Sequence, residues 1–381
     1  MSKNQFIEKQ YGLEKNPFLD RIAREKWLQT WVNREEQLRV WKRVISELES
    51  EKRNNVVLVI GDYGMGKTQS LFKIIDEANK SKYIFSSFLN FRGEQRPSNP
   101  GLDFMFRIIQ SIDFNRLEKI KSKQEIINSI TDISSDFDEV SVALSQCWSK
   151  DQYTRRLSRY FITGQTKPTK TELREIGVIR KIDNIDIAKE YFAGILYLLK
   201  TLGYKSLLLA IDEFEYLFSL VTRAQQSVYL ALVRGLFDFP LGITVALDVE
   251  KMVNIALFLG ISEDGFRRLR EIENEEAAVG GPTRPLLDRV TTTTLYALER
   301  QSTRLLIEKR LSYNRKSGVF EDKPLIPFDE TFVDYVLELS RGSPRQIIWS
   351  CSQVLDAGIE HRVSLLDRET AQELLKEREE V

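Results

Sequence analysis

The residues Val56-Val-Leu-Val-Ile60 lead directly into Gly61-Asp-Tyr-Gly-Met-Gly-Lys-Thr68, and a helical pattern continues from Ser70 to Asn79. The first of these runs is apolar and mostly β-branched, which is typical of a strand buried on both faces of a parallel sheet. The second run has the spacing G-x-x-x-x-G-K-[ST]. Glycines at these positions allow successive backbone N–H groups to point at one anion, and the positive end of the following helix strengthens the attraction. The stretch therefore predicts a strand, a phosphate-binding loop and a helix in that order.

The loop residues predict a nucleotide site that holds ATP and Mg²⁺. Lys67 is expected to reach the β- and γ-phosphates, and the Thr68 hydroxyl is expected to be a Mg²⁺ ligand. A glycine-rich turn without a ligand is the alternative, but the buried strand before the loop and the helix after it favour a nucleotide. The candidate contacts are Gly61, Asp62, Tyr63, Gly64, Met65, Gly66, Lys67, Thr68 and Gln69.

A second apolar run, Leu207-Leu-Leu-Ala-Ile211, ends in the acidic pair Asp212-Glu213. Carboxylates at the carboxyl end of a parallel strand lie beside the crevice where α/β sheets bind their ligands. Asp212 is therefore expected to hold Mg²⁺, and Glu213 is expected to act as the catalytic base that polarises the attacking water. An ordinary strand end before a helix is the alternative, and the phosphate-binding loop elsewhere in the chain argues against it.

The composition excludes most other hydrolytic chemistry. The 381 residues include 56 basic and 56 acidic side chains, one His and two Cys, so the formal net charge is zero. A Ser-His-Asp triad could form only around His361, and a zinc site with two His is impossible. Cys147 and Cys351 cannot build a disulfide framework, which favours a reducing, cytoplasmic location. No apolar stretch is long enough to span a membrane, because Lys200 and Lys205 interrupt the longest one.

The chain is expected to divide into three parts. Residues 1–54 are predicted to be a helical segment, and residues 294–381 an all-helical domain. Residues 55–293 are predicted to form the nucleotide-binding α/β core, with a helical insertion at about 114–190. Within the core, a fourth strand is expected at 243–247, followed by an irregular charged loop at 258–285.

Together these features resemble AAA+ ATPases, which belong to the P-loop NTPases. The similarity is greatest to the clade of origin-recognition initiators, general-secretion ATPases and transposition-regulator ATPases. It rests on Tyr11-Gly-Leu-Glu-Lys-Asn-Pro-Phe18, Val32-Asn-Arg-Glu35 and Gly342-Ser-Pro-Arg345, besides the two motifs above. It covers about residues 10–110 and 185–380, and the insertion has no counterpart. The resemblance implies a parallel sheet flanked by helices and a C-terminal helical lid.

The resemblance also implies roles for particular residues. Residues around Asn16, Pro17 and Phe18, and residues from Val32 to Arg34, are expected to line the adenine site. Arg345 is expected to be the sensor arginine that reaches the γ-phosphate from the lid, and Asp248 corresponds by position to the polar residue that senses the attacking water. The arginine finger, which acts on the ATP of a neighbouring subunit, is expected to be Arg289, with Arg284 as the second candidate.

Residues 155–181 carry many more basic than acidic side chains. Arg155, Arg156 and Arg159, with aromatic residues interleaved, are candidates for contact with a nucleic-acid backbone. A solvated charged face without a ligand is the alternative. A neutral chain makes a poor DNA binder as a single subunit, so DNA binding would require an oligomer that sums weak contacts.

Two functions remain open from the sequence. The first is a slow ATPase that assembles into homo-oligomers on DNA and is stimulated by oligomerisation or by a partner. The second is a protein-remodelling or signalling ATPase of a secretion or defence system, which binds a protein partner and no DNA. A structural subunit that binds nucleotide without hydrolysing it is less favoured, because Glu213 is present.

Overall fold

The computed structural model describes residues 2–20, 22–50, 54–91, 98–219, 222–238, 249–278 and 285–379. The chain divides into two compact units. One unit, called here the loop–lid unit, contains Met1–Arg39, Gly61–Lys73 and Thr294–Val381. The other, called the sheet unit, contains Val40–Ile60 and Ile74–Thr293. Helices α2 (Glu35–Glu49) and α3 (Lys67–Ala78) each begin in the loop–lid unit and end in the sheet unit.

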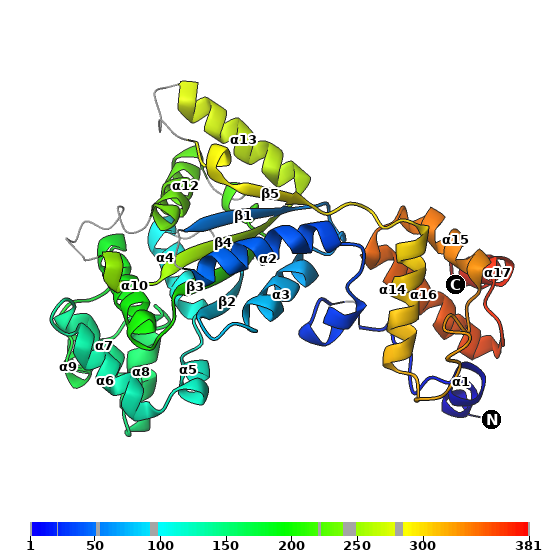
Figure 1. The fold of residues 1–381 in the computed structure, drawn as a ribbon, viewed down its shortest axis with the longest axis horizontal. Helices are drawn as coiled ribbons and strands as arrows, with labels where there is room; N and C mark the ends of the chain where they lie inside the picture. Colours follow the sequence, from blue (N-terminus) through cyan, green and yellow to red (C-terminus); the bar gives the residue numbers. More distant parts are fainter. Residues whose placement is uncertain are drawn as a thin grey trace. The chain divides into compact units, whose positions relative to one another are not determined.

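The sheet has the strand order β2-β3-β4-β1-β5 (Figure 1). Its strands are β1 (Asn55–Ile60), β2 (Ile84–Asn90), β3 (Ser206–Asp212), β4 (Asn254–Ile261) and β5 (Thr291–Thr294). The pairs β2–β3, β3–β4 and β4–β1 are all parallel. Ile60 pairs with Ile261, and Ile211 pairs with Leu259, so β1, β4 and β3 end at the same edge. These strands are almost entirely buried, as their apolar sequences predict.

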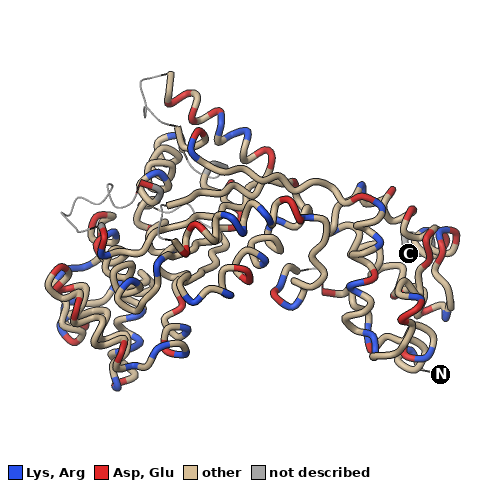
Figure 2. Tube along the Cα trace, in the orientation of Figure 1, with Lys and Arg blue, Asp and Glu red and all other residues tan. Residues whose placement is uncertain are grey.

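The structure contains a strand, β4, that the sequence did not predict. It is formed by Asn254–Ile261, whereas the strand predicted at 243–247 lies outside the described residues. The irregular loop predicted for 258–285 is wrong as far as Ala278, because β4 runs into helix α13 (Glu263–Ala278), and residues 279–284 lie outside the described residues. In the sequence of this helix, the apolar residues Phe266, Leu269 and Ile272 are spaced three residues apart. Most other positions are acidic or basic, as the red and blue segments of α13 show (Figure 2). Such a sparse apolar pattern is a weak helix signal in the sequence.

Helices pack on the sheet through side chains of one continuous apolar core. Helix α4 (Pro100–Ser111) packs against β2, and α12 (Arg223–Phe237) packs against both α4 and β4. Helix α2 is tied to the sheet at two points: the Trp41 indole N–H donates to Thr293 Oγ1 at 3.1 Å, and the Leu48 carbonyl accepts from Ser206 Oγ at 2.9 Å. The other elements of this part of the chain are α10 (Ile185–Thr201), α11 (Tyr216–Ser219), η2 (Val249–Lys251) and η3 (Leu287–Arg289).

The predicted insertion is helical and shares the core of the sheet unit. Its helices are α5 (Phe114–Ile120), α6 (Lys123–Ile133), α7 (Asp138–Gln146), α8 (Gln152–Ile162) and α9 (Lys170–Glu175). Helices α6 and α7 pack on α10. A Cβ at Gly194 would lie 2.6 Å from Val140 Cγ1, so α10 needs a glycine where α7 crosses it. Burial raises the pKa of the Cys147 thiol to about 12, so this cysteine is a core residue.

The loop–lid unit has its own apolar core, built from α1 and the lid helices. Its elements are α1 (Lys3–Tyr11), η1 (Glu25–Thr30), α14 (Arg300–Tyr313), α15 (Glu330–Ser340), α16 (Pro344–His361) and α17 (Arg368–Glu379). The Tyr11 hydroxyl donates to the Val363 carbonyl, and the Asn16 side chain donates to the Ser352 carbonyl at 3.2 Å. The N-terminal residues therefore belong structurally to the lid.

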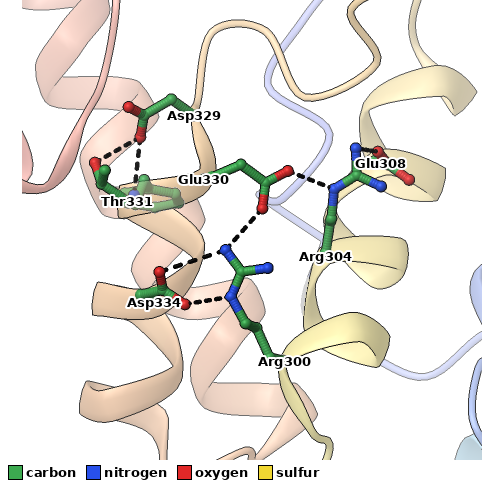
Figure 3. Close-up of polar contacts among 8 residues, drawn as sticks. Arg300, Arg304, Glu308, Asp329, Glu330, Thr331 and Asp334 are labelled. Carbon is green, nitrogen blue, oxygen red and sulfur yellow. Dashed lines mark hydrogen bonds and ion pairs between the residues drawn. The ribbon is translucent and has the colours of Figure 1, made fainter.

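An ion-pair network joins α14 to α15 on the lid surface (Figure 3). The Arg300 guanidinium contacts Asp334 at 2.5 Å and Glu330 at 2.9 Å, and Arg304 contacts Glu330 at 2.7 Å. These side chains are about half exposed, so solvent screens the pairs and each contributes little to the stability of the fold. Within the described part of the chain, no helix is long and apolar enough to cross a membrane.

Candidate nucleotide-binding site

The phosphate loop, residues 61–68, has the backbone conformation that its glycines make possible. Gly64 and Gly66 have φ of 87° and 91°, a region that residues with a Cβ rarely adopt. The Met65 amide donates to the Asp62 carbonyl at 3.1 Å and closes a turn. A Cβ at Gly66 would meet no heavy atom within 4 Å, so the space beside this residue is open. The loop thus offers room for an anion at the start of α3.

The Lys67 side chain folds back over the phosphate loop. Its ammonium group donates to the Gly61 carbonyl at 2.7 Å and to the Asp62 carbonyl at 3.4 Å. Phosphate oxygens are stronger acceptors than these carbonyls, because hydrogen bonds between ionised groups are about twice as strong as neutral ones. Lys67 therefore lies where a bound phosphate can draw it into contact.

The lid helix α16 begins directly on the phosphate loop, within the loop–lid unit. The Arg345 amide donates to the Gly64 carbonyl at 3.3 Å. The Arg345 guanidinium carbon lies 4.4 Å from the centre of the Tyr63 ring. A Cβ at Gly64 would lie 2.7 Å from Ser343 Oγ and 3.2 Å from Arg345 Cβ, so the close approach depends on this glycine. The structure thus brings together Arg345 and the loop, which lie far apart in the sequence.

Arg34 fixes the loop from its other side. It is 4% exposed and donates to the carbonyls of Tyr296 at 2.5 Å, Asn33 at 3.1 Å and Met65 at 3.5 Å. Burial lowers the pKa of its guanidinium. The resemblance placed Arg34 among the residues that line the adenine site, and the sequence gave no sign that Arg34 bridges the loop to the start of the lid.

The residues expected to line the adenine site are buried in the loop–lid unit. Phe18 and Val32 belong to its apolar core, and the Phe18 ring makes an edge contact with Phe328 at 6.1 Å. The Pro17 carbonyl accepts from the Arg310 guanidinium at 3.4 Å. The contacts of Pro17, Phe18 and Val32 are packing contacts, and their contact with adenine stays a prediction. Gln69, predicted as a contact of the phosphate loop, accepts from the Arg24 amide at 3.2 Å and donates to the Arg24 carbonyl at 3.1 Å.

In the sheet unit, Asp212 and Glu213 stand at the carboxyl end of β3. Asp212 is the last strand residue and is 1% exposed, and its carbonyl accepts from the Phe91 amide at 3.0 Å. Glu213 has a φ of 57°, and the next amide, of Phe214, donates to the Gly260 carbonyl at 2.9 Å. A non-glycine residue in this conformation costs about 1–3 kcal/mol and is typical of functional sites.

Ser262 is a candidate that the sequence prediction missed. It follows β4, and its Oγ accepts from the Gly265 amide at 3.1 Å at the start of α13. This is the strand end where the resemblance places a polar water-sensing residue. Asp248, predicted for that role, lies outside the described residues, as does Arg284. A strand prediction at Asn254–Ile261 would have identified Ser262, because Ser262 is the first residue after that strand.

The Arg289 segment is held firmly within the sheet unit. The Arg289 guanidinium makes a two-pronged contact with the Asp238 carboxylate, at 2.8 and 3.1 Å. The buried Glu273 carboxylate accepts from the amides of Leu286 at 2.7 Å and Leu287 at 2.9 Å, and it pairs with Arg234 at 2.8 Å. The segment before Arg289 is therefore fixed to α13 and α12.

The three basic candidates of the insertion have different surroundings. Arg155 donates twice to the Ser149 carbonyl, at 2.8 and 2.6 Å. Arg159 donates to the Cys147 carbonyl at 3.0 Å and pairs with Glu118 at 2.8 Å. Arg156 is exposed, and its guanidinium carbon lies 5.1 Å from the centre of the Tyr160 ring. Two of the three arginines thus hold the insertion together, and Arg156 faces solvent.

The strand order and the loop that follows β1 define the AAA+ P-loop ATPase fold, as the sequence predicted. The ORC2 protein of Aeropyrum pernix, solved in ADPNP and ADP complexes, matches with a TM-score of 0.55 at 14% identity, over 95% of this chain and 72% of that one. Cdc6p of Pyrobaculum aerophilum matches with a TM-score of 0.47 at 12% identity, over 95% and 70%. Drosophila ORC bound to DNA matches with a TM-score of 0.44 at 12% identity, over 98% and 65%.

A family model described as "BREX system ATP-binding protein BrxC/D" matches residues 113–243. The match extends from the insertion helices through β3 and α12, and it includes the segment for which the resemblance offered no counterpart. No curated protein is significantly similar to this chain in sequence.

Proposed function

We propose that the chain binds ATP with Mg²⁺ and hydrolyses it slowly, as a switch that works in oligomers. One observation carries the proposal: the glycine-rich loop before α3 has open space beside Gly66, and Arg345 of the lid is fixed to the same loop. A lid that starts on the loop can couple the state of the nucleotide to the position of the lid helices.

The proposed roles follow from the chemistry of phosphoryl transfer. The loop amides and Lys67 bind the phosphates, and Arg345 contacts the γ-phosphate. Thr68 and Asp212 would hold Mg²⁺, which neutralises charge on the phosphate oxygens when it is bound. Glu213 activates the attacking water, and Ser262 is our candidate for orienting it.

Arg289 is proposed to act on the ATP of a neighbouring subunit. A guanidinium supplied by a neighbour stabilises negative charge on the transferring phosphoryl group, so hydrolysis rises when subunits assemble. In this structure Asp238 holds Arg289 by two hydrogen bonds. We propose that, when subunits assemble, the Arg289 guanidinium leaves Asp238 and contacts the phosphate of the neighbouring subunit's ATP.

For the partner, we propose DNA contacted by the oligomer through the insertion. Support comes from Arg156 and the aromatic rings of Tyr160 and Tyr153, which are exposed on α8. A cation and aromatic rings on one exposed helix suit a nucleic-acid backbone and its bases. Arg155 and Arg159 would position this helix through their bonds to backbone carbonyls.

The second candidate is an ATPase of a defence system whose insertion binds a protein. The match of residues 113–243 to the BREX family model favours it, since it falls on the insertion. A cytoplasmic location suits either function, and it is supported by the two free, buried cysteines.

A DNA-binding measurement distinguishes the two candidate functions. We expect the Glu213→Gln protein with a non-hydrolysable ATP analogue to bind DNA more tightly than it does without nucleotide, with affinity that falls as salt rises. Arg156→Glu should weaken this binding. If no DNA binds at low salt in either state, the DNA role is wrong, and the protein-binding candidate takes its place.

A further inference from the structure

Tyr63 is an unusual element of the phosphate loop because its large ring is 68% exposed. The ring packs under the Arg345 guanidinium, with 4.4 Å between the guanidinium carbon and the ring centre. The backbones of the neighbouring residues are joined as well, since the Gly64 carbonyl accepts from the Arg345 amide at 3.3 Å. Two independent contacts therefore hold the first turn of α16 on the rim of the loop.

The geometry has a direct physical consequence for Arg345. An arginine side chain in water samples many rotamers, and restricting it to bind a ligand has an entropic cost. An aromatic ring beneath the guanidinium reduces this freedom before any ligand arrives. The Tyr63 ring covers one face of the planar Arg345 guanidinium, so the N–H groups at the edge of the guanidinium can still bind a phosphate.

We propose that Tyr63 is a positioning residue that preorganises Arg345 for the γ-phosphate of ATP. The inference rests on the proposed function. Without nucleotide, the ring holds the guanidinium at the loop rim; with a triphosphate, the same guanidinium has only a short movement to make. ADP lacks the group that Arg345 reads, so Tyr63 increases the preference for the triphosphate over the diphosphate.

The test compares the affinities of a non-hydrolysable ATP analogue and of ADP in four variants: Tyr63→Ala, Tyr63→Phe, Arg345→Ala and the Tyr63→Ala/Arg345→Ala double variant. We expect Tyr63→Ala to reduce the preference for the triphosphate about two- to fivefold, the size of an exposed cation–π contact. Tyr63→Phe keeps the ring and should keep the preference. In the Arg345→Ala background, removing Tyr63 should cause no further loss.

The inference is overturned if Tyr63→Ala weakens both nucleotides equally, since the residue then supports the loop and not Arg345. A loss that persists undiminished in the Arg345→Ala background overturns it too. If the wild type binds neither nucleotide, the proposed function and the inference fall together. If the wild type prefers the triphosphate and Tyr63→Ala keeps that preference, only the inference falls.

Discussion

The amide of Arg345 donates a hydrogen bond to the carbonyl of Gly64 across 3.3 Å, and this bond fixes the start of the lid helix α16 to the phosphate loop. The contact is possible because Gly64 carries no side chain where Ser343 and Arg345 approach. If nucleotide binding moves the loop, the lid is linked to that movement through backbone atoms. Small changes at this contact are therefore expected to alter nucleotide binding strongly.

Gly64→Ala is expected to weaken ATP binding by about tenfold or more. The backbone φ of Gly64 is 87°, which is strained for alanine, and the new Cβ would lie 2.7 Å from Ser343 Oγ and 3.2 Å from Arg345 Cβ. A strained conformation alone costs about 1–3 kcal/mol. Gly203→Ala is the matched control, since it has a φ of 90° with no heavy atom within 4 Å. The control should lower stability and keep nucleotide affinity; equal affinity in Gly64→Ala and wild type would refute the docking account.

Glu273→Ala should lower the free energy of unfolding by about 3 kcal/mol, because it leaves two backbone amides without an acceptor and leaves Arg234 with Glu276 as its one carboxylate partner. Glu275 lies on the same helix, is 58% exposed and pairs with Arg223 at 3.5 Å. Glu275→Ala should therefore change stability by less than about 0.5 kcal/mol. Urea unfolding of both variants measures their free energies of unfolding. Similar decreases in the two variants would show that the contacts of Glu273 do not stabilise the fold more than those of an exposed glutamate.

The stability of the insertion should fall in acid through Glu139. Burial acts to raise the pKa of this carboxyl, but hydrogen bonds from the backbone and side chain of Arg180 and from the Ile179 amide outweigh it and lower the pKa below the usual 4.5. Stability from a carboxyl with a lowered folded-state pKa is present above its unfolded value and is lost as pH falls through the folded one.

Glu139→Gln should accordingly destabilise the protein at pH 7 and show a smaller further loss below about pH 4.5 than the wild type. Glu175→Gln is the control, because Glu175 is an exposed carboxylate of the same insertion. Urea midpoints at pH 7 and pH 4 give the comparison. An unchanged acid dependence in Glu139→Gln would assign the acid sensitivity to other groups.

Mixing experiments test Arg289 as a residue that acts between subunits. Arg289→Ala keeps its phosphate loop, and Lys67→Ala keeps its Arg289, so each variant alone should hydrolyse ATP poorly. Mixed oligomers should recover part of the activity at shared interfaces. Arg267→Ala, an exposed arginine paired with Asp264 at 3.2 Å, serves as the control and should stay active. If mixing restores no ATPase activity, Arg289 does not act between subunits, and its role is the structural contact with Asp238.

The phosphate loop and its flanking elements were predictable because local sequence determines them. The β-branched run before Gly61 and the glycine spacing each require the same local structure, and Asp212 ends β3 where its apolar run stops. The fold class followed from these elements and was confirmed.

The position of β4 was not predictable, since the sequence contains two apolar runs of strand character, at 243–247 and 254–261. Pairing with β1 and β3 places the second run in the sheet as β4, and that pairing is non-local. The same limit applies to Arg155 and Arg159, whose charge suggested a ligand. Their carbonyl partners become visible only when the insertion is folded.

Single-turnover hydrolysis tests whether the phosphate loop and the acidic pair act on one ATP. Wild type, Lys67→Ala and Glu213→Gln are each mixed in excess with labelled ATP and Mg²⁺, and bound ATP and released phosphate are measured in the same samples. We predict that the wild type binds and cleaves ATP, Glu213→Gln binds ATP without cleaving it, and Lys67→Ala does neither. Cleavage by Lys67→Ala at the wild-type rate would contradict the account.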